Sequence, residues 1–223
     1  MNDLSITQSY LLCAVNDKGL LPGMRPERGA CFLAAGLLEL RLAGCLTLEK
    51  RKVSLCAPLP AELGYLRALY DRIAQKQPVK VDSLVERYLF SFSDRDLREL
   101  LDPVGDSLVS LGLAEVRPAG LLGNQRGYVP TARGIPAVIE PLRAELLEDG
   151  PVTEEAAMLT ILLEKGECLK PYFSRYEQDA LRARLRQFAA TPEGALVKEM
   201  VGYLELLIGI CSSAGAAGAG GAG

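Results

Sequence analysis

The amino-acid sequence predicts a mostly α-helical fold, arranged as a single globular domain with two short β-hairpins. Three observations support this prediction. Apolar residues recur at helical spacing over most of the 223 residues, alternation of apolar and polar residues is confined to short runs in two places, and the chain is long enough to bury one sizeable core. We expect the domain to span residues 1–211. Residues 212–223 are nearly all alanine and glycine, which predicts a disordered tail.

The first quarter of the chain predicts two helices and a hairpin. Residues 4–15 place apolar side chains at helical spacing. Residues 29–43 are apolar on nearly every side, which is typical of a central, buried helix. The short alternating runs 45–49 and 52–56 predict the first β-hairpin.

The middle of the chain predicts a series of amphipathic helices. Residues 62–74 and 81–90 each carry apolar side chains on one face. Residues 94–111 continue the pattern, but Asp102 followed by Pro103 resembles an N-cap and the first position of a new helix. We therefore expect either two helices or one kinked helix over this stretch.

The last part of the chain predicts the second hairpin and further helices. Residues 112–116 and 127–130 are typical of strands, with a loop between them. A helix follows from Thr131, and the prolines at 136 and 141 are expected to break it. Three more helices are predicted over residues 152–163, 174–188 and 191–210.

The composition excludes several classes of catalytic site. The chain has no histidine, so it cannot form a Ser-His-Asp or Cys-His site or a histidine-ligated metal centre. It also lacks P-loop, dinucleotide-binding, zinc-protease and EF-hand motifs. Glu154 and Glu155 are candidate general acids, but the first turn of a predicted helix explains them through the helix dipole. We expect no enzymatic activity, no cofactor and no metal.

The cysteines and the N-terminus predict a cytoplasmic protein. None of the six cysteines forms a CxxC pair and most lie in apolar stretches, so we expect reduced core residues. The N-terminus has no basic region followed by an apolar signal core. The longest strongly apolar run, residues 29–38, is too short to span a bilayer. Peripheral association with a membrane surface stays compatible with these observations.

Residues 79–130 follow the order helix, helix, hairpin, as in a winged helix, which raises the hypothesis of DNA binding. The helix that would enter the major groove, residues 94–111, carries five acids and two arginines. Phosphate contacts dominate DNA affinity, so DNA would repel an acidic helix. We therefore favour a packing role for this substructure and expect no nucleic-acid partner.

Leu121 and Leu122 occupy the expected tip of the second hairpin, between Arg117 and Arg126. Leucines beside cations on a loop tip suit shallow insertion into an anionic bilayer. Each leucine would contribute roughly 1.5–3 kcal/mol if fully buried. The alternative is that the loop folds back and buries both leucines, and the residues themselves leave the two interpretations equal.

Five segments of the chain carry a resemblance to a known family: residues 4–19, 36–46, 97–100, 109–114 and 176–185. Their order and spacing resemble the Golgi phosphoprotein family, the phosphatidylinositol-4-phosphate-binding proteins of the eukaryotic Golgi, which has many bacterial relatives. The resemblance implies a non-enzymatic, mostly helical domain with a flat membrane-facing side. It implies a basic pocket for the lipid headgroup beside an apolar hairpin, here residues 112–130. Eukaryotic members also bind glycosyltransferase tails and a vesicle coat.

The chain departs from the family pattern at three of the four pocket positions. Met24 stands near the family's tryptophan, Leu33 replaces an arginine, and Leu101 replaces the second of two arginines on the central helix, of which Arg98 matches the first. Arg25 and Arg28 can supply replacement charge from the loop before the second helix. The expected headgroup residues are therefore Arg98, Arg25, Arg28, Arg117 and Arg126, and the expected membrane-inserting residues are Leu121 and Leu122.

Two classes of function stay open from the sequence. The leading hypothesis is a non-enzymatic peripheral membrane adaptor that binds anionic phospholipid. The alternative is a soluble protein-interaction scaffold that kept the fold and lost the lipid site. The missing pocket residues favour this alternative, as does the stretch 145–167 with its seven acids and one lysine. A protein partner and self-association are compatible with either hypothesis.

Overall fold

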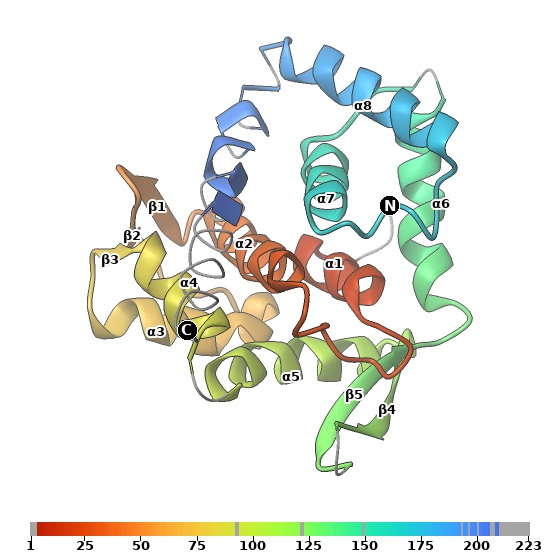
Figure 1. Ribbon diagram of the computed structural model, residues 1–223. Helices are drawn as coiled ribbons and strands as arrows, with labels where there is room; N and C mark the ends of the chain where they lie inside the picture. The colour runs from red at the N-terminus through yellow and green to blue at the C-terminus, as the bar shows by residue number, and fades with distance from the viewer. Residues whose placement is uncertain are drawn as a thin grey trace, which may run out of the picture.

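The computed structural model describes residues 4–91, 94–120, 123–148, 150–192, 194–195, 197–199, 201–205 and 208–209. Within these residues the chain forms a single, mostly helical domain of eight α-helices, one 3-10 helix and two small antiparallel sheets (Figure 1). The predicted fold class is confirmed. The predicted tail, residues 212–223, lies outside the described residues.

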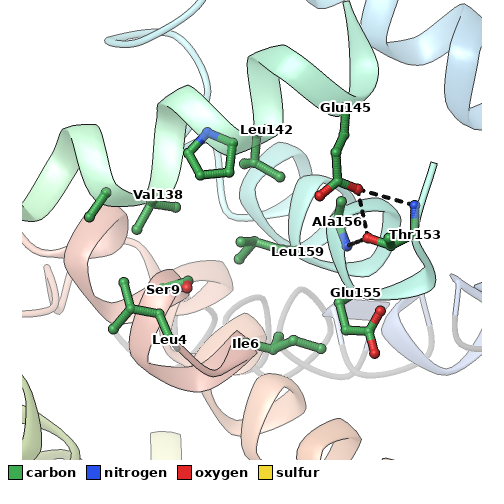
Figure 2. A pocket seen from close by; sticks show the side chains of 12 residues that line it. Leu4, Ile6, Ser9, Val138, Leu142, Glu145, Thr153, Glu155, Ala156 and Leu159 are labelled. Carbon is green, nitrogen blue, oxygen red and sulfur yellow. Dashed lines mark hydrogen bonds between the residues drawn. The ribbon is translucent and has the colours of Figure 1, made fainter. Parts of the chain in front are cut away.

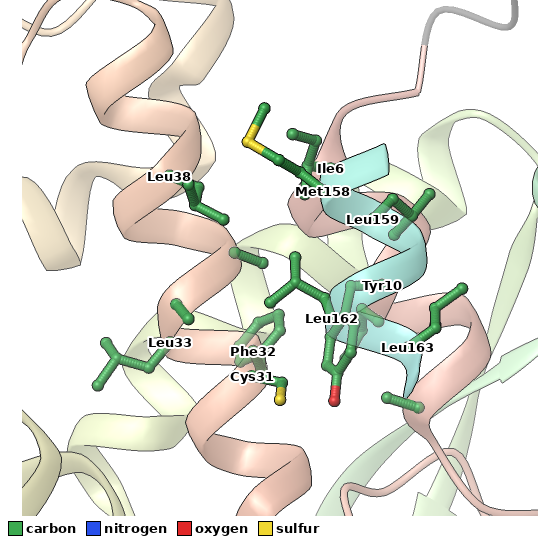
Figure 3. Close-up of a cluster of buried hydrophobic side chains, with 14 of the residues drawn as sticks. Ile6, Tyr10, Cys31, Phe32, Leu33, Leu38, Met158, Leu159, Leu162 and Leu163 are labelled. Carbon is green, nitrogen blue, oxygen red and sulfur yellow. The ribbon is translucent and has the colours of Figure 1, made fainter. Parts of the chain in front are cut away.

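The core is built on α1 (Ile6–Ala14), α2 (Pro26–Leu42) and α7 (Glu154–Lys165). All nine residues of α1 are buried, as expected for a helix that other elements surround. Figure 3 shows Tyr10 of α1, Phe32 of α2 and Leu162 of α7 pointing into one apolar cluster. A capping box at Ser5 begins α1, so the chain enters this cluster with its first backbone N–H groups satisfied.

The first sheet has one strand more than expected. Strands β1 (Leu46–Glu49) and β2 (Lys52–Leu55) form the predicted hairpin, and the short strand β3 (Val79–Lys80) adds to β2. Alternation decides the orientation of the sheet, because Leu46, Leu48 and Val53 are buried whereas the intervening side chains are exposed. The two residues of β3 are too few to give a recognisable alternating pattern.

The helices of the middle segment differ in two ways from the prediction. The expected helix 62–74 begins as a 3-10 helix, η1 (Ala61–Leu66), and continues as α3 (Arg67–Gln75). Helix α4 (Val81–Leu89) follows, and α5 (Arg95–Ser110) then runs through Pro103 as one helix. Of the two expected arrangements, the division into two helices was wrong and a single helix forms. Leu100, Leu101, Val104 and Leu108 bury one continuous apolar face, which offsets the hydrogen bond lost at the proline.

The second hairpin and the C-terminal helices complete the domain. Strands β4 (Ala114–Ala119) and β5 (Gln125–Pro130) are followed by α6 (Gly134–Leu146) and α8 (Arg175–Ala189). The predicted break in α6 was wrong. Pro136 is the third residue of the helix, where a backbone N–H has no intrahelical partner, and Pro141 lies between the buried residues Ile139 and Leu142. In the predicted helix 191–210, residues 197–199 and 201–205 are helical.

No disulfide joins the cysteines of the described residues, and four of the five are buried. Cys56 departs from the expectation because it is exposed at the end of β2. Within the described part of the chain, no helix is both long and apolar enough to cross a bilayer, and no three metal-ligating side chains gather into a cluster.

Candidate functional site

The β4–β5 hairpin, residues 114–130, stands out from the helical body (Figure 1). It follows α4 and α5 in the order that the winged-helix interpretation predicted. The hairpin is fixed at its base, where the N–H of Tyr128 donates to the carbonyl of Gly19 at 2.8 Å. A side chain on Gly127 would overlap the backbone of Lys18, so glycine allows the loop after α1 to pack directly on β5.

Tyr128 seats the hairpin on α5. Its ring is buried against Gly105, where an added Cβ would lie 2.5 Å from two ring atoms. The hydroxyl donates to Asp106 at 3.2 Å. Burial, followed by the negative charges of Asp102 and Asp106, raises the pKa of Tyr128. The tyrosine therefore stays neutral, and its buried ring and hydroxyl hold the hairpin against α5.

Arg98, the one residue that matches the expected pocket, holds the hairpin. Its guanidinium donates to the carbonyl of Arg126 and to the side-chain oxygen of Gln125, both at 2.8 Å. The carboxylate of Asp102 lies 3.6 Å away on the next turn of α5. The Arg98 side chain is only 21 % exposed, so its guanidinium interacts mainly with groups of the same chain.

Arg126 and Arg117 both lie on the hairpin but on opposite faces. Arg126 donates to both carboxylate oxygens of Asp106 and stacks over Tyr128, 5.2 Å from the ring centre. Its hydrogen bond to Asp106 raises the pKa of the Arg126 guanidinium. Arg117 pairs with Gly127 in the strand register, which turns its side chain to the other face, where it contacts Glu115 at 3.2 Å.

Arg25 and Arg28 lie elsewhere, at the start of α2. Arg28 donates to the carbonyl oxygens of Ala14 at 2.8 Å and Gly166 at 3.3 Å, and Arg25 forms an ion pair with Glu167. Among the described residues these two arginines share no hydrogen-bonding or ion-pair partner with Arg98 or Arg126. They join the start of α2 to the loop after α7.

The positions of the two missing family arginines are filled by the core. Leu33 is fully buried and Leu101 is 2 % exposed. Met24, near the family's tryptophan position, is 97 % exposed. Leu121 and Leu122 lie outside the described residues, between Gly120 and Gly123. Both glycines have a positive φ, near 81° and 66°, a backbone conformation that favours glycine.

Charge around the hairpin is balanced. Three arginines, at 98, 117 and 126, face three carboxylates, at 102, 106 and 115. An incoming phosphate would compete with those carboxylates for the guanidinium groups, so this arrangement favours weak over tight headgroup binding. The arginines were predictable from the sequence as cations near the hairpin, but their partners depend on how the hairpin packs on α5.

A separate, largely apolar pocket lies between the N-terminal segment, α6 and α7 (Figure 2). Leu4, Val138 and Leu159 line it, and Glu145 stands at one end. Glu145 accepts hydrogen bonds from the N–H and hydroxyl of Thr153, at 3.2 and 2.7 Å, and thereby supports the N-cap of α7. No sequence pattern indicates this pocket, because its lining comes from three distant segments.

A comparison with protein-family models matches the chain to Golgi phosphoprotein 3 (GPP34) over residues 6–204. The chain belongs to the Golgi phosphoprotein 3 family. This match confirms the resemblance drawn from the five sequence segments. Members of the family are peripheral Golgi proteins that bind phosphatidylinositol 4-phosphate and are in general not enzymes. The search of curated proteins gave no match.

Proposed function

We propose that this member of the Golgi phosphoprotein 3 family is a non-enzymatic, cytoplasmic adaptor that docks peripherally on anionic phospholipid through the β4–β5 hairpin. The proposal rests on one observation: in this family member the β4–β5 hairpin is anchored to α5. Tyr128 and Arg98 fix β5 to α5, so the strands that lead to residues 121 and 122 are held on a rigid support. Strands that are already fixed lose little conformational entropy when the hairpin docks on a surface.

Leu121 and Leu122 are the proposed membrane-inserting residues. If each leucine transfers about half of its surface, the pair contributes roughly 1.5–3 kcal/mol, a factor of about 10–100 in the partition coefficient. The proposed headgroup contacts come from Arg98, Arg117 and Arg126, with Arg25 and Arg28 as further cations. Because all five guanidiniums have partners within the chain, we expect modest selectivity for phosphatidylinositol 4-phosphate over other anionic lipids.

Vesicle co-sedimentation at low ionic strength tests both parts of the proposal. Phosphatidylcholine vesicles that contain either phosphatidylserine or phosphatidylinositol 4-phosphate are compared with phosphatidylcholine alone. The double substitution Leu121→Asp/Leu122→Asp is expected to lower binding to both anionic vesicles by about tenfold or more. The control Leu42→Asp/Leu111→Asp, at two exposed leucines outside the hairpin, is expected to bind like the parent. Equal binding by both double variants would refute insertion.

Arg126→Gln tests headgroup contact with less damage to the support than Arg98→Gln. If Arg126 contacts the headgroup, the variant loses preference for phosphatidylinositol 4-phosphate but retains binding to phosphatidylserine vesicles. The control is Arg67→Gln, an exposed arginine on α3 paired with Asp71. An unchanged lipid preference would count against a headgroup site at the hairpin.

The second candidate function, a soluble protein-interaction scaffold, is favoured by two specific observations. Leu33 and Leu101 are buried in the core, and the arginines nearest the expected pocket are neutralised by carboxylates. This function predicts no binding to any of the vesicles. It also predicts a stable complex with a protein partner that forms in the absence of membrane.

A further inference from the structure

A basic groove lies between the end of α3, β3 and α4, away from the hairpin. Its lining includes Arg72, Lys76, Lys80 and Arg87 together with the polar side chains of Gln75 and Ser83. None of the described residues that line it is acidic. Figure 1 shows these elements on the left of the molecule and the hairpin at the lower right. None of these cations belongs to a sequence motif that predicts binding.

Two of the four cations are held in place by a single carboxylate. The carboxylate of Asp96, in the first turn of α5, forms ion pairs with the guanidinium groups of Arg72 at 2.7 Å and Arg87 at 3.1 Å. The Asp96 side chain is 14 % exposed, so it lies beneath the two guanidiniums and does not line the groove. The three groups leave one net positive charge, and each guanidinium keeps further N–H donors.

The two lysines of the groove have no ion pair in the described part of the chain. Lys76 and Lys80 are both exposed. The neighbouring acid Asp82 is engaged by Arg51 at 2.6 Å. Together with the arginine pair on Asp96, the two lysines give the groove an uncompensated charge of about three, in contrast to the balanced charge at the hairpin.

The sheet beside the groove also carries an electrostatic cost. Lys80 of β3 stands directly opposite Lys52 of β2, and like charges in such a cross-strand pair repel one another. The N-terminus of α4 begins at the next residue, Val81, and adds the positive end of a helix dipole. An anion bound near Lys80 would relieve the repulsion and interact favourably with this helix end.

We propose that this groove is a binding site for a phosphate-bearing ligand, held by Lys76, Lys80, Arg72 and Arg87. Arginine forks and lysine ammonium groups are the usual partners of phosphate oxygens. The shared chemistry is a phosphate group with two or more negative charges, which belongs either to a lipid headgroup or to a soluble phosphate compound. The site does not depend on the hairpin, and it would give the protein a second place at which to bind an anion.

Titration calorimetry with inorganic pyrophosphate at low salt, and co-sedimentation with vesicles that contain phosphatidylinositol 4-phosphate, test the groove. Lys76→Gln/Lys80→Gln is expected to weaken binding of at least one probe by about tenfold. The matched control is Lys170→Gln/Lys198→Gln, at two exposed lysines elsewhere that also have no ion pair among the described residues. A loss with pyrophosphate alone identifies a soluble phosphate ligand, and a loss with vesicles identifies a lipid headgroup.

A charge reversal separates binding from folding. Lys80→Glu is expected to abolish binding while it raises the unfolding temperature, because it turns the Lys52–Lys80 repulsion into an attraction. The proposal is overturned if the groove and control variants bind both probes equally, or if neither probe binds the parent protein. Leu121→Asp/Leu122→Asp should keep full pyrophosphate binding, so failure at the hairpin and failure at the groove remain distinguishable.

Discussion

Replacing Gly105 by alanine is expected to destabilise the protein, although alanine is the better helix former. Gly105 lies inside α5, where the substitution normally stabilises a helix by about 1 kcal/mol. Here the new Cβ would lie 2.5 Å from two atoms of the Tyr128 ring, well inside the 3.5–4.0 Å at which carbon atoms pack. Because the ring is buried, it has no free space into which to move.

The two effects can be weighed against each other. Overpacking a tight core site costs about 1–3 kcal/mol, and displacement of Tyr128 also breaks its hydrogen bond to Asp106, worth about 1 kcal/mol. We expect a net loss of about 1–3 kcal/mol after the gain in helix propensity is subtracted. For a protein of this size that corresponds to a fall in Tm of roughly 2–12 °C.

Thermal and urea unfolding measure the effect against two references. Gly202→Ala is the matched control, because Gly202 is exposed in a helical segment and a Cβ there meets no atom of the described residues within 4 Å. It should gain up to about 1 kcal/mol. In a Tyr128→Ala background, Gly105→Ala should cease to destabilise, which reveals the coupling of the two sites. If Gly105→Ala stabilises the parent as much as Gly202→Ala does, the seating of the hairpin on α5 has been described incorrectly.

Three further outcomes follow from other contacts. Glu39→Ala should cost about 2–4 kcal/mol in urea unfolding, because it leaves a buried α1 N–H and the hydroxyl of Tyr65 without their shared acceptor; Tyr65→Phe should cost less. Lys50→Asn/Arg51→Gly should raise the unfolding free energy by about 1 kcal/mol, because both residues have positive φ in the β1–β2 turn; no gain would contradict a type I′ turn there. Burial raises the pKa of Tyr88 to about 12, so the folded state binds more protons than the unfolded state between pH 10 and 12. The contribution of Tyr88 to the free energy of unfolding is complete below pH 10 and falls between pH 10 and 12. Urea unfolding of the parent and of Tyr88→Phe across this interval measures the difference. If the free energy of unfolding depends on pH equally in both proteins, Tyr88 is not buried as described.

Much of the fold was predictable because short-range patterns and burial agree. The alternating runs of the first hairpin and the apolar spacing of α1 each point to one structure, and both elements form nearly as predicted. The break predicted at Pro141, and the division into two helices at Pro103, were wrong. Pro103 and Pro141 lie inside continuous helices, because burial of neighbouring leucines on one helix face outweighs the loss of a single hydrogen bond. The helix propensity of a proline can be read from its position in the sequence. The burial of a helix face depends on which other elements pack against it.

The candidate site was predictable only in part, for a similar reason. The sequence identified Arg98 and Arg126 as cations near a hairpin, but it contains no signal that Arg98 donates to the backbone of β5 or that Asp106 engages Arg126. The basic groove was missed because its cations come from three elements. In the linear sequence Asp71, Asp82 and Glu86 lie close to these four cations, and only the packing of α3, β3 and α4 separates the two signs of charge.

The two proposed contacts with anions should respond differently to salt. The arginines at the hairpin are paired with carboxylates, so the affinity that the hairpin contributes comes mainly from Leu121 and Leu122 and should change little between low and moderate ionic strength. The groove carries uncompensated charge, so its contribution should weaken as the screening length shortens from about 30 Å at 0.01 M salt to about 8 Å at 0.15 M. Lys76→Gln/Lys80→Gln should therefore flatten the salt dependence of vesicle binding, whereas Leu121→Asp/Leu122→Asp should leave its slope unchanged and lower its level. The opposite assignment of slope and level would mean that the hairpin arginines, and not the groove lysines, supply most of the salt-dependent part of vesicle binding.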